Sequence, residues 1–533
     1  MTELGDEPVF AEGIGLGPLR DAGPLHGRHS PRWRAGSDLW CACSSTRPHC
    51  KACYRRVPLD RNRCEFLVRK KNGRTVRTGS VDPGSRESWC RRVHRAPRRT
   101  EREVLARRGS HAAAVRGAVD GGARGRAPWL SSHRREARMT TRAGVGFSNE
   151  SSSTDAGTAA AQEALRTLGG GEADIVFVFA STNHDYGKLL PAIRKIIGPV
   201  PLVGCSTAGE FTHAHVGHGS VAVMAIKSDV IRFRVGFGRG LKAMRQSATT
   251  EALKSFAAEH RAARTAGFGH ATCIVLSDGL AGQGEDIVES VHASASMLAQ
   301  VVGGAAADDA KFARTDVFLD DRHYTDAIVV VSAFSKTPIG IGVRHGLSSA
   351  CPSMIVTRAA GNVIHEIDGR PALDAYERFA AGIGEPLTEA NRDAFMITHE
   401  LGMLTSSGEY KIRAPLKATD ERAIVMASEV PVGASVAIMT GTEEKLVSAA
   451  EHAARSALVN LAGGRPGAVL VFDCICRRIF LGEQYKRQVA AFRSVVGQDV
   501  PLIGWETYGE IALTPGQQSG WHNSTSVVAI LPD

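Results

Sequence analysis

Three segments of the sequence place a carboxylate at the same distance from a glycine. They read VPLVGCSTAGE at 200–210, QVVGGAAADD at 300–309 and VPLIGWETYGE at 500–510. Glu210, Asp309 and Glu510 each follow a glycine by six positions, and Asp308 adds a fourth acid. Taken singly, each carboxylate fits a role in accepting backbone N–H groups or capping a helix. As a set facing one pocket, they predict a site for an ammonium or another cationic group.

Other side chains complete this predicted ligand site. The large rings of Trp505 and Tyr508 would line an apolar pocket and leave a polar tip to orient the ligand. Packing between loops explains these rings equally well. Polar residues before the last apolar run would hydrogen-bond a ligand or the neighbouring loop. The residues concerned are Cys205, Ser206, Thr207, Trp505, Tyr508, His522 and Asn523. The glycines at 204, 303 and 504 would let the backbone turn sharply and approach the ligand.

Arg477 is a further candidate, because its guanidinium suits a ligand carboxylate. It would equally well hold Glu483 or a loop. Cys474 and Cys476 alternate among apolar residues of the same expected strand, which favours buried, inert thiols. The sequence holds no G-x-S-x-G, G-x₄-G-K-[ST] or H-E-x-x-H motif, and the glycine runs at 236–240 and 340–346 have the wrong spacing for a dinucleotide loop. We therefore expect no catalytic residue, cofactor or metal ligand.

One unit of strand, helix, strand and loop occurs three times around these segments. The expected strands are short and rich in Val and Ile, and each unit is followed by another apolar run. The units are 174–210, 272–309 and 468–510, and the runs after them are 220–226, 327–334 and 526–531. Strands that are apolar on both faces fit a sheet covered by helices. The sequence predicts an α/β fold with a mixed, largely parallel sheet and a ligand site beyond the carboxyl ends of its strands.

Residues 340–450 have a different pattern. Alternating stretches at 354–363 and 423–428, punctuated by Gly and Pro, predict antiparallel strands. Residues 371–381 form an amphipathic pattern that begins with proline, as a helix often does. We expect an antiparallel insertion that acts as a subdomain or a lid.

Charge divides the chain at Met139. Residues 1–138 hold 30 Lys and Arg against 14 Asp and Glu, a net charge of +16, whereas the remainder is acidic overall. This first part lacks apolar periodicity. A basic arm that binds nucleic acid, a zinc site from the cysteines at 41, 43, 50 and 53, and a spurious out-of-frame extension are the three readings. We favour the last, and expect the acidic body to bind neither nucleic acid nor membrane.

The body also indicates its cellular setting. Its longest apolar runs, such as 327–334, are far shorter than the ~20 residues that cross a bilayer. It holds five cysteines, an odd and sparse set that is typical of reduced thiols in a large domain. We expect a cytoplasmic protein.

The motifs together resemble the FIST family of sensory proteins. The N-terminal part is matched by FVFAS at 177–181, by PLVGCSTAGE at 201–210 and by VVGGAAADD at 301–309. The C-terminal part is matched by IDGRPALDAYE at 367–377, FDCICRRIFLG at 472–482, GWETYGEIA at 504–512 and HNST at 522–525. The resemblance predicts an N-terminal FIST domain at 139–345 and a C-terminal one at 346–533. Cys474 and Arg477 match the family's cysteine and arginine.

The resemblance also implies a function. It predicts a protein that senses a small ligand, with amino acids or their derivatives as the expected class, and that relays this to signalling partners. We therefore expect ligand binding that closes the insertion, with a separate signalling protein as partner. The alternative is an enzyme that acts on a small amine- or acid-bearing metabolite, with the loop carboxylates as acid and base.

Overall fold

The structure is a computed structural model that describes residues 140–513 and 519–533. The predictions for residues 1–138, including the zinc site and the basic arm, lie outside the described residues.

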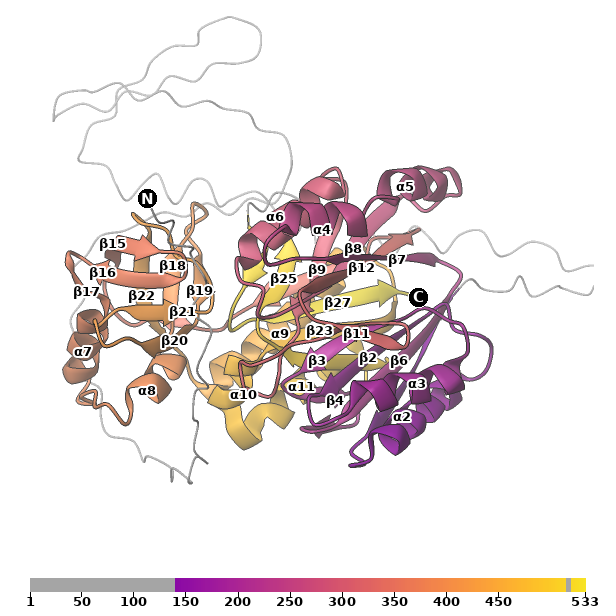
Figure 1. The fold of residues 1–533 in the computed structure, drawn as a ribbon, viewed down its shortest axis with the longest axis horizontal. Coiled ribbons are helices and arrows are strands. Elements are labelled where there is room, and N and C mark those ends of the chain that lie inside the picture. The colour runs from indigo at the N-terminus through magenta and orange to yellow at the C-terminus, as the bar shows by residue number, and fades with distance from the viewer. Residues whose placement is uncertain (1–139, 514–518) are drawn as a thin grey trace, which may run out of the picture. The chain divides into compact units, whose positions relative to one another are not determined.

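Three stretches of the body fold into the same succession of elements (Figure 1). The first repeat comprises β1 (Thr141–Ser148), α2 (Ser153–Leu168), β2 (Ile175–Ser181), α3 (Tyr186–Ile197), β3 (Leu202–Thr207) and β6 (Val221–Ser228). The second comprises β7 (Ile231–Arg239), α4 (Arg245–Ala252), α5 (Phe256–Thr265), β8 (His270–Ser277), α6 (Gly284–Ser294), β9 (Gln300–Ala305) and β12 (Ala327–Ser335). The third comprises β13 (Gly340–Arg344), α9 (Glu443–Asn460), β23 (Pro466–Cys474), α10 (Ile475–Leu481), α11 (Tyr485–Val496), β24 (Leu502–Thr507) and β27 (Ser526–Pro532). The predicted unit is therefore preceded, in every repeat, by one more strand and helix.

Each repeat also lends a hairpin to the sheet of another repeat. The hairpins are β4 (Glu210–Thr212) with β5 (Val216–Gly217), β10 (Val317–Leu319) with β11 (Arg322–Tyr324), and β25 (Glu510–Leu513) with β26 (Trp521–His522). The first repeat's hairpin extends the third sheet beside β24, the second's extends the first sheet beside β3, and the third's extends the second sheet beside β9. The three repeats are interlocked in a closed cycle, and strands from both sides of residue 345 pair directly.

The sheets have identical strand orders, namely β1-β6-β2-β3-β10-β11, β7-β12-β8-β9-β25-β26 and β13-β27-β23-β24-β4-β5. One pair in each sheet is parallel, namely β2–β3, β8–β9 and β23–β24. The predicted α/β class with mixed sheets is confirmed. The parallel share is smaller than predicted, because each repeat makes one strand–helix–strand crossover while its other strands return antiparallel.

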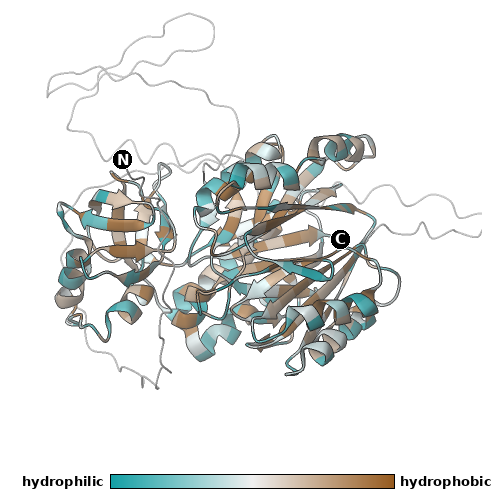
Figure 2. Cartoon of the chain, viewed as in Figure 1, coloured by the Kyte–Doolittle hydropathy of each residue, from teal (hydrophilic) through white to brown (hydrophobic). Residues whose placement is uncertain are grey.

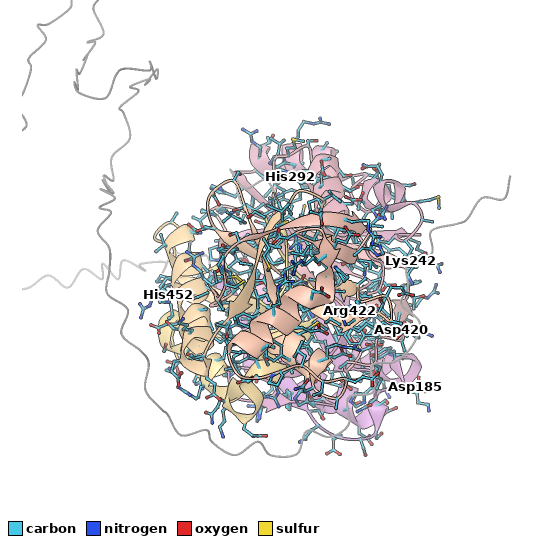
Figure 3. The ribbon with its side chains drawn as sticks, turned by 90° about the vertical axis from the view of Figure 1, so that its left-hand side faces the viewer. Asp185, Lys242, His292, Asp420, Arg422 and His452 are labelled. Atoms are coloured by element: carbon cyan, nitrogen blue, oxygen red, sulfur yellow. The ribbon has the colours of Figure 1, made fainter. Side chains whose placement is uncertain are left out.

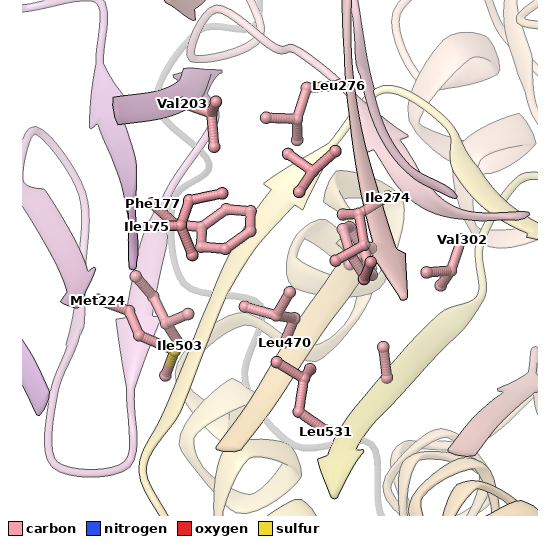
Figure 4. Close-up of a cluster of buried hydrophobic side chains, with 14 of the residues drawn as sticks. Ile175, Phe177, Val203, Met224, Ile274, Leu276, Val302, Leu470, Ile503 and Leu531 are labelled. Atoms are coloured by element: carbon pink, nitrogen blue, oxygen red, sulfur yellow. The ribbon is translucent and has the colours of Figure 1, made fainter. Parts of the chain in front are cut away.

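The inner faces of the three sheets pack on one another. Ile175, Phe177, Ile274, Leu470 and Ile503 belong to this common core, which draws on all three sheets (Figure 4). The outer faces pack against α2 and α3, against α4 to α6, and against α9 and α11. In Figure 2 the strands are hydrophobic, and the helices that cover them turn hydrophilic residues outward. Burial on both faces explains the continuous apolar runs of the sequence.

A Gly-x-Gly sequence marks the first strand of every repeat. A Cβ at any of these glycines would lie 1.7–2.0 Å from a carbonyl oxygen of α2, α4 or α9. They are Gly144 and Gly146 in β1, Gly236 and Gly238 in β7, and Gly340 and Gly342 in β13. Glycine is required here because the strand and the helix backbones touch.

The predicted antiparallel insertion lies between β13 and α9, at residues 345–442, and is called the insertion below. Its elements are β14 (Ser348–Ser349), β15 (Met354–Ala360), β16 (Val363–Ile367), β17 (Arg370–Pro371), α7 (Ala372–Gly382), α8 (Arg392–Thr398), β18 (Leu401–Leu404), β19 (Tyr410–Arg413), β20 (Pro415–Ala418), β21 (Ile424–Met426) and β22 (Ser435–Thr440). Its strand pairs are antiparallel and enclose a core of their own. Across the described parts of both body and insertion, no helix has the length and apolarity to span a membrane.

Candidate functional site

The segments after β3, β9 and β24 meet in the middle of the body, and we call this meeting point the loop junction. Backbone bonds join them in pairs. Ala208 N donates to Glu506 O at 3.1 Å, and Glu506 N donates to Gly209 O at 2.9 Å. Ala307 N donates to the carbonyl of Ser206 at 2.9 Å. The three carboxylate-bearing segments therefore contact one another, as their shared position in the repeats suggests.

Glu210 and Glu510 occupy equivalent, fully buried positions in the loop junction. Thr507 Oγ1 donates to Glu510 Oε1 at 2.6 Å, and Thr525 donates to Oε2 from its N–H at 3.1 Å and from its hydroxyl at 2.8 Å. Thr207 and Ser220 make the same bonds to Glu210. Burial raises the pKa of Glu210 to about 8 and that of Glu510 well above its usual range. Both carboxylates hold the fold together, and neither is exposed as an acid or base for an external substrate.

The two aspartates of the second repeat differ from each other. Asp308 is buried and accepts the N–H groups of Phe312 at 2.8 Å, Ala313 at 2.6 Å and Arg314 at 2.8 Å, together with the hydroxyl of Tyr508. It therefore shapes its own loop. Asp309 reaches the first repeat instead and accepts Thr182 N at 3.1 Å and Ser181 Oγ at 3.0 Å.

The other residues predicted in these segments also have partners inside the protein. Cys205 and Trp505 lie in strands and are fully buried, with the Trp505 ring stacked on Phe179 at 3.8 Å between centroids. Ser206 Oγ accepts Asp316 N at 2.9 Å. The Tyr508 ring stacks on Phe312 at 4.5 Å. Trp505 thus belongs to the core rather than to the wall of a pocket.

The glycines of the three segments serve close packing between neighbouring strands. A Cβ on Gly204 would lie 1.8 Å from Val178 O, and one on Gly303 would lie 2.0 Å from Val275 O. A Cβ on Gly504 would lie 2.3 Å from the Phe211 ring, which belongs to the exchanged hairpin of the first repeat. The backbone approaches another strand at these points, not a ligand.

Arg477 lies on α10, so the predicted strand is wrong beyond Cys474, where β23 ends. Its side chain is buried, and all five guanidinium N–H donors have protein acceptors. These include Leu446 O at 2.7 Å, His345 O at 2.7 Å and Gln488 Oε1 at 2.6 Å, with Ser524 O at 3.4 Å. Arg477 therefore holds the start of the insertion, α9, α11 and the C-terminal loop together.

His522 and Asn523 lie where the body contacts the insertion. They belong to β26 and the turn after it, and the last strand, β27, starts at Ser526, where the last apolar run was predicted to begin. Ser428 of the insertion donates to Asn523 Oδ1 at 2.8 Å, while His522 Nε2 donates to Ala512 O at 3.1 Å. Asn523 therefore joins the body to the insertion.

A cavity of 680 Å³, called the insertion cleft below, opens at this contact. The body lines it with α6 and the β25–β26 hairpin, and the insertion lines it from four separate segments. Its walls are mostly apolar, with charged groups among them. The body contributes Glu285, Val288, Glu289, His292, Leu513 and Ser519, and the insertion contributes Ala359, Met403, Arg413, Glu429, Val430 and Val432.

A charged cluster at the cleft ties the insertion to the body. Glu285 Oε1 is 2.7 Å from Lys411 Nζ and 2.6 Å from Arg413 Nη2, and it accepts Ser519 Oγ at 2.6 Å. Burial by itself would raise the pKa of Glu285, but the charges of Lys411 and Arg413 lower it to about 2. Burial lowers the pKa of Lys411 to about 8, against the attraction of Glu285. The prediction from sequence missed all three residues; the i, i+2 spacing of Lys411 and Arg413 on one strand face was the available signal.

Glu400 is a second buried acid at this contact, and it was not among the residues predicted from the sequence. One carboxylate oxygen accepts the Ser524 hydroxyl of the body, and the other has no partner in the described part of the chain. Burial raises the pKa of Glu400 to about 8, although the nearby Arg477 charge opposes this shift.

A smaller cavity of 390 Å³ lies elsewhere on the body, at the start of α3, and is called the α3 cavity below. Polar residues line most of it, among them His184 and Asp185. Figure 3 labels Asp185 in this cavity and His292 in the insertion cleft, and the two lie well apart. The two cavities are therefore separate sites.

Comparison with known families decides the relationship. A profile of the FIST N domain matches residues 174–370, and a profile of the FIST C domain matches residues 372–513. This chain belongs to the FIST family. The resemblance read from the sequence motifs is confirmed, and with it the membership of a family of sensory signal-transduction proteins.

Two curated relatives of this FIST protein are named as uncharacterized proteins. An uncharacterized protein of Mycobacterium tuberculosis strain ATCC 25618/H37Rv is 24% identical over 404 residues, which cover 74% of this chain and 100% of the relative. An uncharacterized protein of Methanocaldococcus jannaschii is 27% identical over 159 residues, 28% of this chain and 30% of the relative. A solved structure of a cyanuric acid hydrolase aligns with 12% identity and a TM-score of 0.29, over 74% of this chain and 100% of that one. A likeness that weak carries no argument about activity.

Proposed function

We propose that this protein is a cytoplasmic sensor that binds a small metabolite in the insertion cleft. The observation that carries the proposal is that this 680 Å³ cavity is walled by both the body and the insertion. Its volume lies within the range of about 300–1,000 Å³ that is usual for small-molecule sites. A ligand in it would touch both parts at once.

The lining indicates the kind of ligand. Val288, Met403 and Val430 offer an apolar wall. Glu289 of α6 and Glu429 of the insertion also line the cleft, and neither carboxylate has an ion-pair or hydrogen-bond partner within the ranges 140–513 and 519–533. An amine-bearing ligand with an apolar body, such as an amino acid or a related metabolite, matches both features.

Binding would become a signal through the position of the insertion. The present contacts, Glu285 with Arg413 and Ser428 with Asn523, belong to the closed arrangement. A ligand that contacts both walls binds this arrangement better than an open one, and so raises its population. We propose that a separate signalling protein reads this change.

Thermal unfolding of the full chain against a panel of amino acids, polyamines and neutral analogues tests the proposal. A ligand at 100 times its dissociation constant stabilises the protein by about 2.7 kcal/mol. Glu429→Gln keeps the shape of the side chain but removes its charge, and should abolish the stabilisation by amines that carry an apolar body. Glu409→Gln, at an exposed site on the same insertion, should retain it. Equal stabilisation of the two variants by these ligands would reject the insertion cleft as the site. So would a parent protein that no compound of the panel stabilises.

A further inference from the structure

The α3 cavity lies at a place in the first repeat that corresponds to the insertion cleft in the second. In both repeats, a cavity forms between the helix after the second strand and the chain that enters from the next repeat. For the α3 cavity, the helix is α3 and the entering chain carries the β10–β11 hairpin of the second repeat. For the insertion cleft, the helix is α6 and the entering chain carries the β25–β26 hairpin of the third repeat. The insertion covers one of the two places. The other is lined by polar groups of the body itself.

One buried ring nitrogen in the α3 cavity has no hydrogen-bond partner among the described residues. His184 is 5% exposed, and its Nε2 lies 3.2 Å from Gly219 O. A carbonyl oxygen only accepts, so Nε2 carries the proton and Nδ1 presents a lone pair. Within the described ranges no group donates to Nδ1. Burial lowers the pKa of His184, so the ring stays neutral and Nδ1 remains an acceptor.

The charged groups around His184 largely neutralise one another. Arg314 makes two bonds of 2.9 Å to Asp316, and His323 Nδ1 lies 2.8 Å from the same carboxylate. Lys311 Nζ donates to Thr182 Oγ1 at 2.7 Å. With the imidazoles counted as neutral, the charged groups at the cavity and their ion-pair partners leave an excess of one negative charge: four carboxylates (Asp185, Asp308, Asp309 and Asp316) against three cations (Lys188, Lys311 and Arg314).

An unsatisfied acceptor beneath a slightly negative lining disfavours an anion and favours a ligand rich in N–H donors. The cavity, at 390 Å³, is also too small for a large molecule. We infer that the α3 cavity is a second ligand site that takes a small primary amine, whose N–H donates to His184 Nδ1. This site is distinct from the insertion cleft and does not depend on the function proposed for that cleft.

The charge of Lys311 determines in which direction the affinity for an amine should change when this residue is replaced. Its ammonium occupies the acceptors that an amine would use, on Thr182 and Asp309, and its side chain is half exposed. Removing that charge should strengthen the binding of an amine and weaken the binding of an anion. Lys311→Met is therefore expected to raise the affinity for the amine, and an exposed substitution of this kind is compatible with folding.

The experiment is calorimetric titration of the full chain with ethanolamine, and with acetate and inorganic phosphate as anionic probes. We expect ethanolamine to bind and the anions not to. His184→Phe, which keeps an aromatic ring but removes the acceptor, should weaken ethanolamine about tenfold. Glu429→Gln, in the insertion cleft, should leave this binding unchanged, so the two sites fail independently.

Three results would overturn the inference. One is loss of ethanolamine binding in Glu429→Gln but not in His184→Phe, which would place the amine in the insertion cleft. Another is binding of acetate or phosphate that Lys311→Met weakens, which would make the cavity an anion site. The third is weaker ethanolamine binding in Lys311→Met, which remains informative even where His184→Phe fails to fold.

Discussion

Glu285 of the body forms an ion pair with Arg413 of the insertion, with 2.6 Å between Oε1 and Nη2. Arg413 is almost fully buried, and Lys411 beside it shares the same carboxylate at 2.7 Å. Two buried cations therefore depend on one acid from the other side of the contact. The docking of the insertion rests on charge as well as on apolar packing.

Replacing Glu285 should for this reason release the insertion. Glu285→Gln removes the ion-pair partner that Lys411 and Arg413 have among the described residues, and breaking a buried pair in this way costs about 3 kcal/mol of the free energy of unfolding. Urea denaturation at neutral pH measures the loss. The control is Glu443→Gln, which removes an exposed pair with Arg487 at 3.7 Å and should cost under about 1 kcal/mol. Equal losses in the two variants would show that the cluster does not hold the insertion.

Glu400 makes stability depend on pH in a definite direction. Its pKa in the folded protein is raised to about 8 from an ordinary 4.5, so the folded state binds this proton more tightly than the unfolded chain does. The stabilisation is complete below pH 4.5 and is lost as pH rises through 8. A glutamine at position 400 is neutral at every pH. Between pH 5 and 8, Glu400→Gln should therefore make the fall in the free energy of unfolding less steep, by about 1.4 kcal/mol per pH unit. The free energy of unfolding measured from pH 5 to 8 checks this.

The pH dependence has a second source and needs a control. Glu210 has a pKa raised to about 8 as well, so a decline remains in the Glu400→Gln variant. Glu389→Gln, exposed on the same insertion, should keep the full slope of the parent protein. A slope unaltered by Glu400→Gln would mean that Glu400 gains solvent in the folded state.

Many strands and helices could be predicted from the sequence, because buried elements have a recognisable pattern of apolar residues. Strands such as β2, buried along their whole length, appear as unbroken apolar runs, and the crossover helices between them show the helical period. The predicted unit left out the first strand and helix of each repeat, although Gly-x-Gly at 144, 236 and 340 is a repeat in itself. The exchanged hairpins leave no local signal, because each pairs through a strand of three or four residues with a partner more than a hundred positions away.

The predicted site was less readable, for a physical reason. Glu210 and Glu510 were recognised by type and spacing, but spacing does not reveal whether Thr207 or Thr507 already holds them. The insertion cleft depends on contacts such as Glu285 with Arg413, across 128 positions of sequence. A pattern within one segment does not encode a partnership of that range.

The glycine of the first segment offers a sharp test of its structural role. A Cβ on Gly204 would meet Val178 O at 1.8 Å, and backbone cannot yield as a flexible side chain does. Gly204→Ala should cost about 3 kcal/mol or more of the free energy of unfolding. Gly269→Ala, with nothing within 4 Å of the added Cβ, should change it by under about 1 kcal/mol. Denaturation curves of the two variants decide between a packing role and a role in ligand binding.

The exchange of hairpins predicts that the repeats unfold together. Phe211, on the hairpin lent by the first repeat, is fully buried and packs on Tyr485 and Phe492 of the third, with centroids 5.8 and 6.4 Å away. Phe211→Ala should lower the free energy of unfolding by about 3–5 kcal/mol. Hydrogen exchange followed by mass spectrometry should then show faster exchange in β24 and in β2 alike, because the two sheets share the hairpin and the common core. Faster exchange confined to β24 and α11 would show instead that the third sheet opens alone, and that the interlocked repeats are energetically separate.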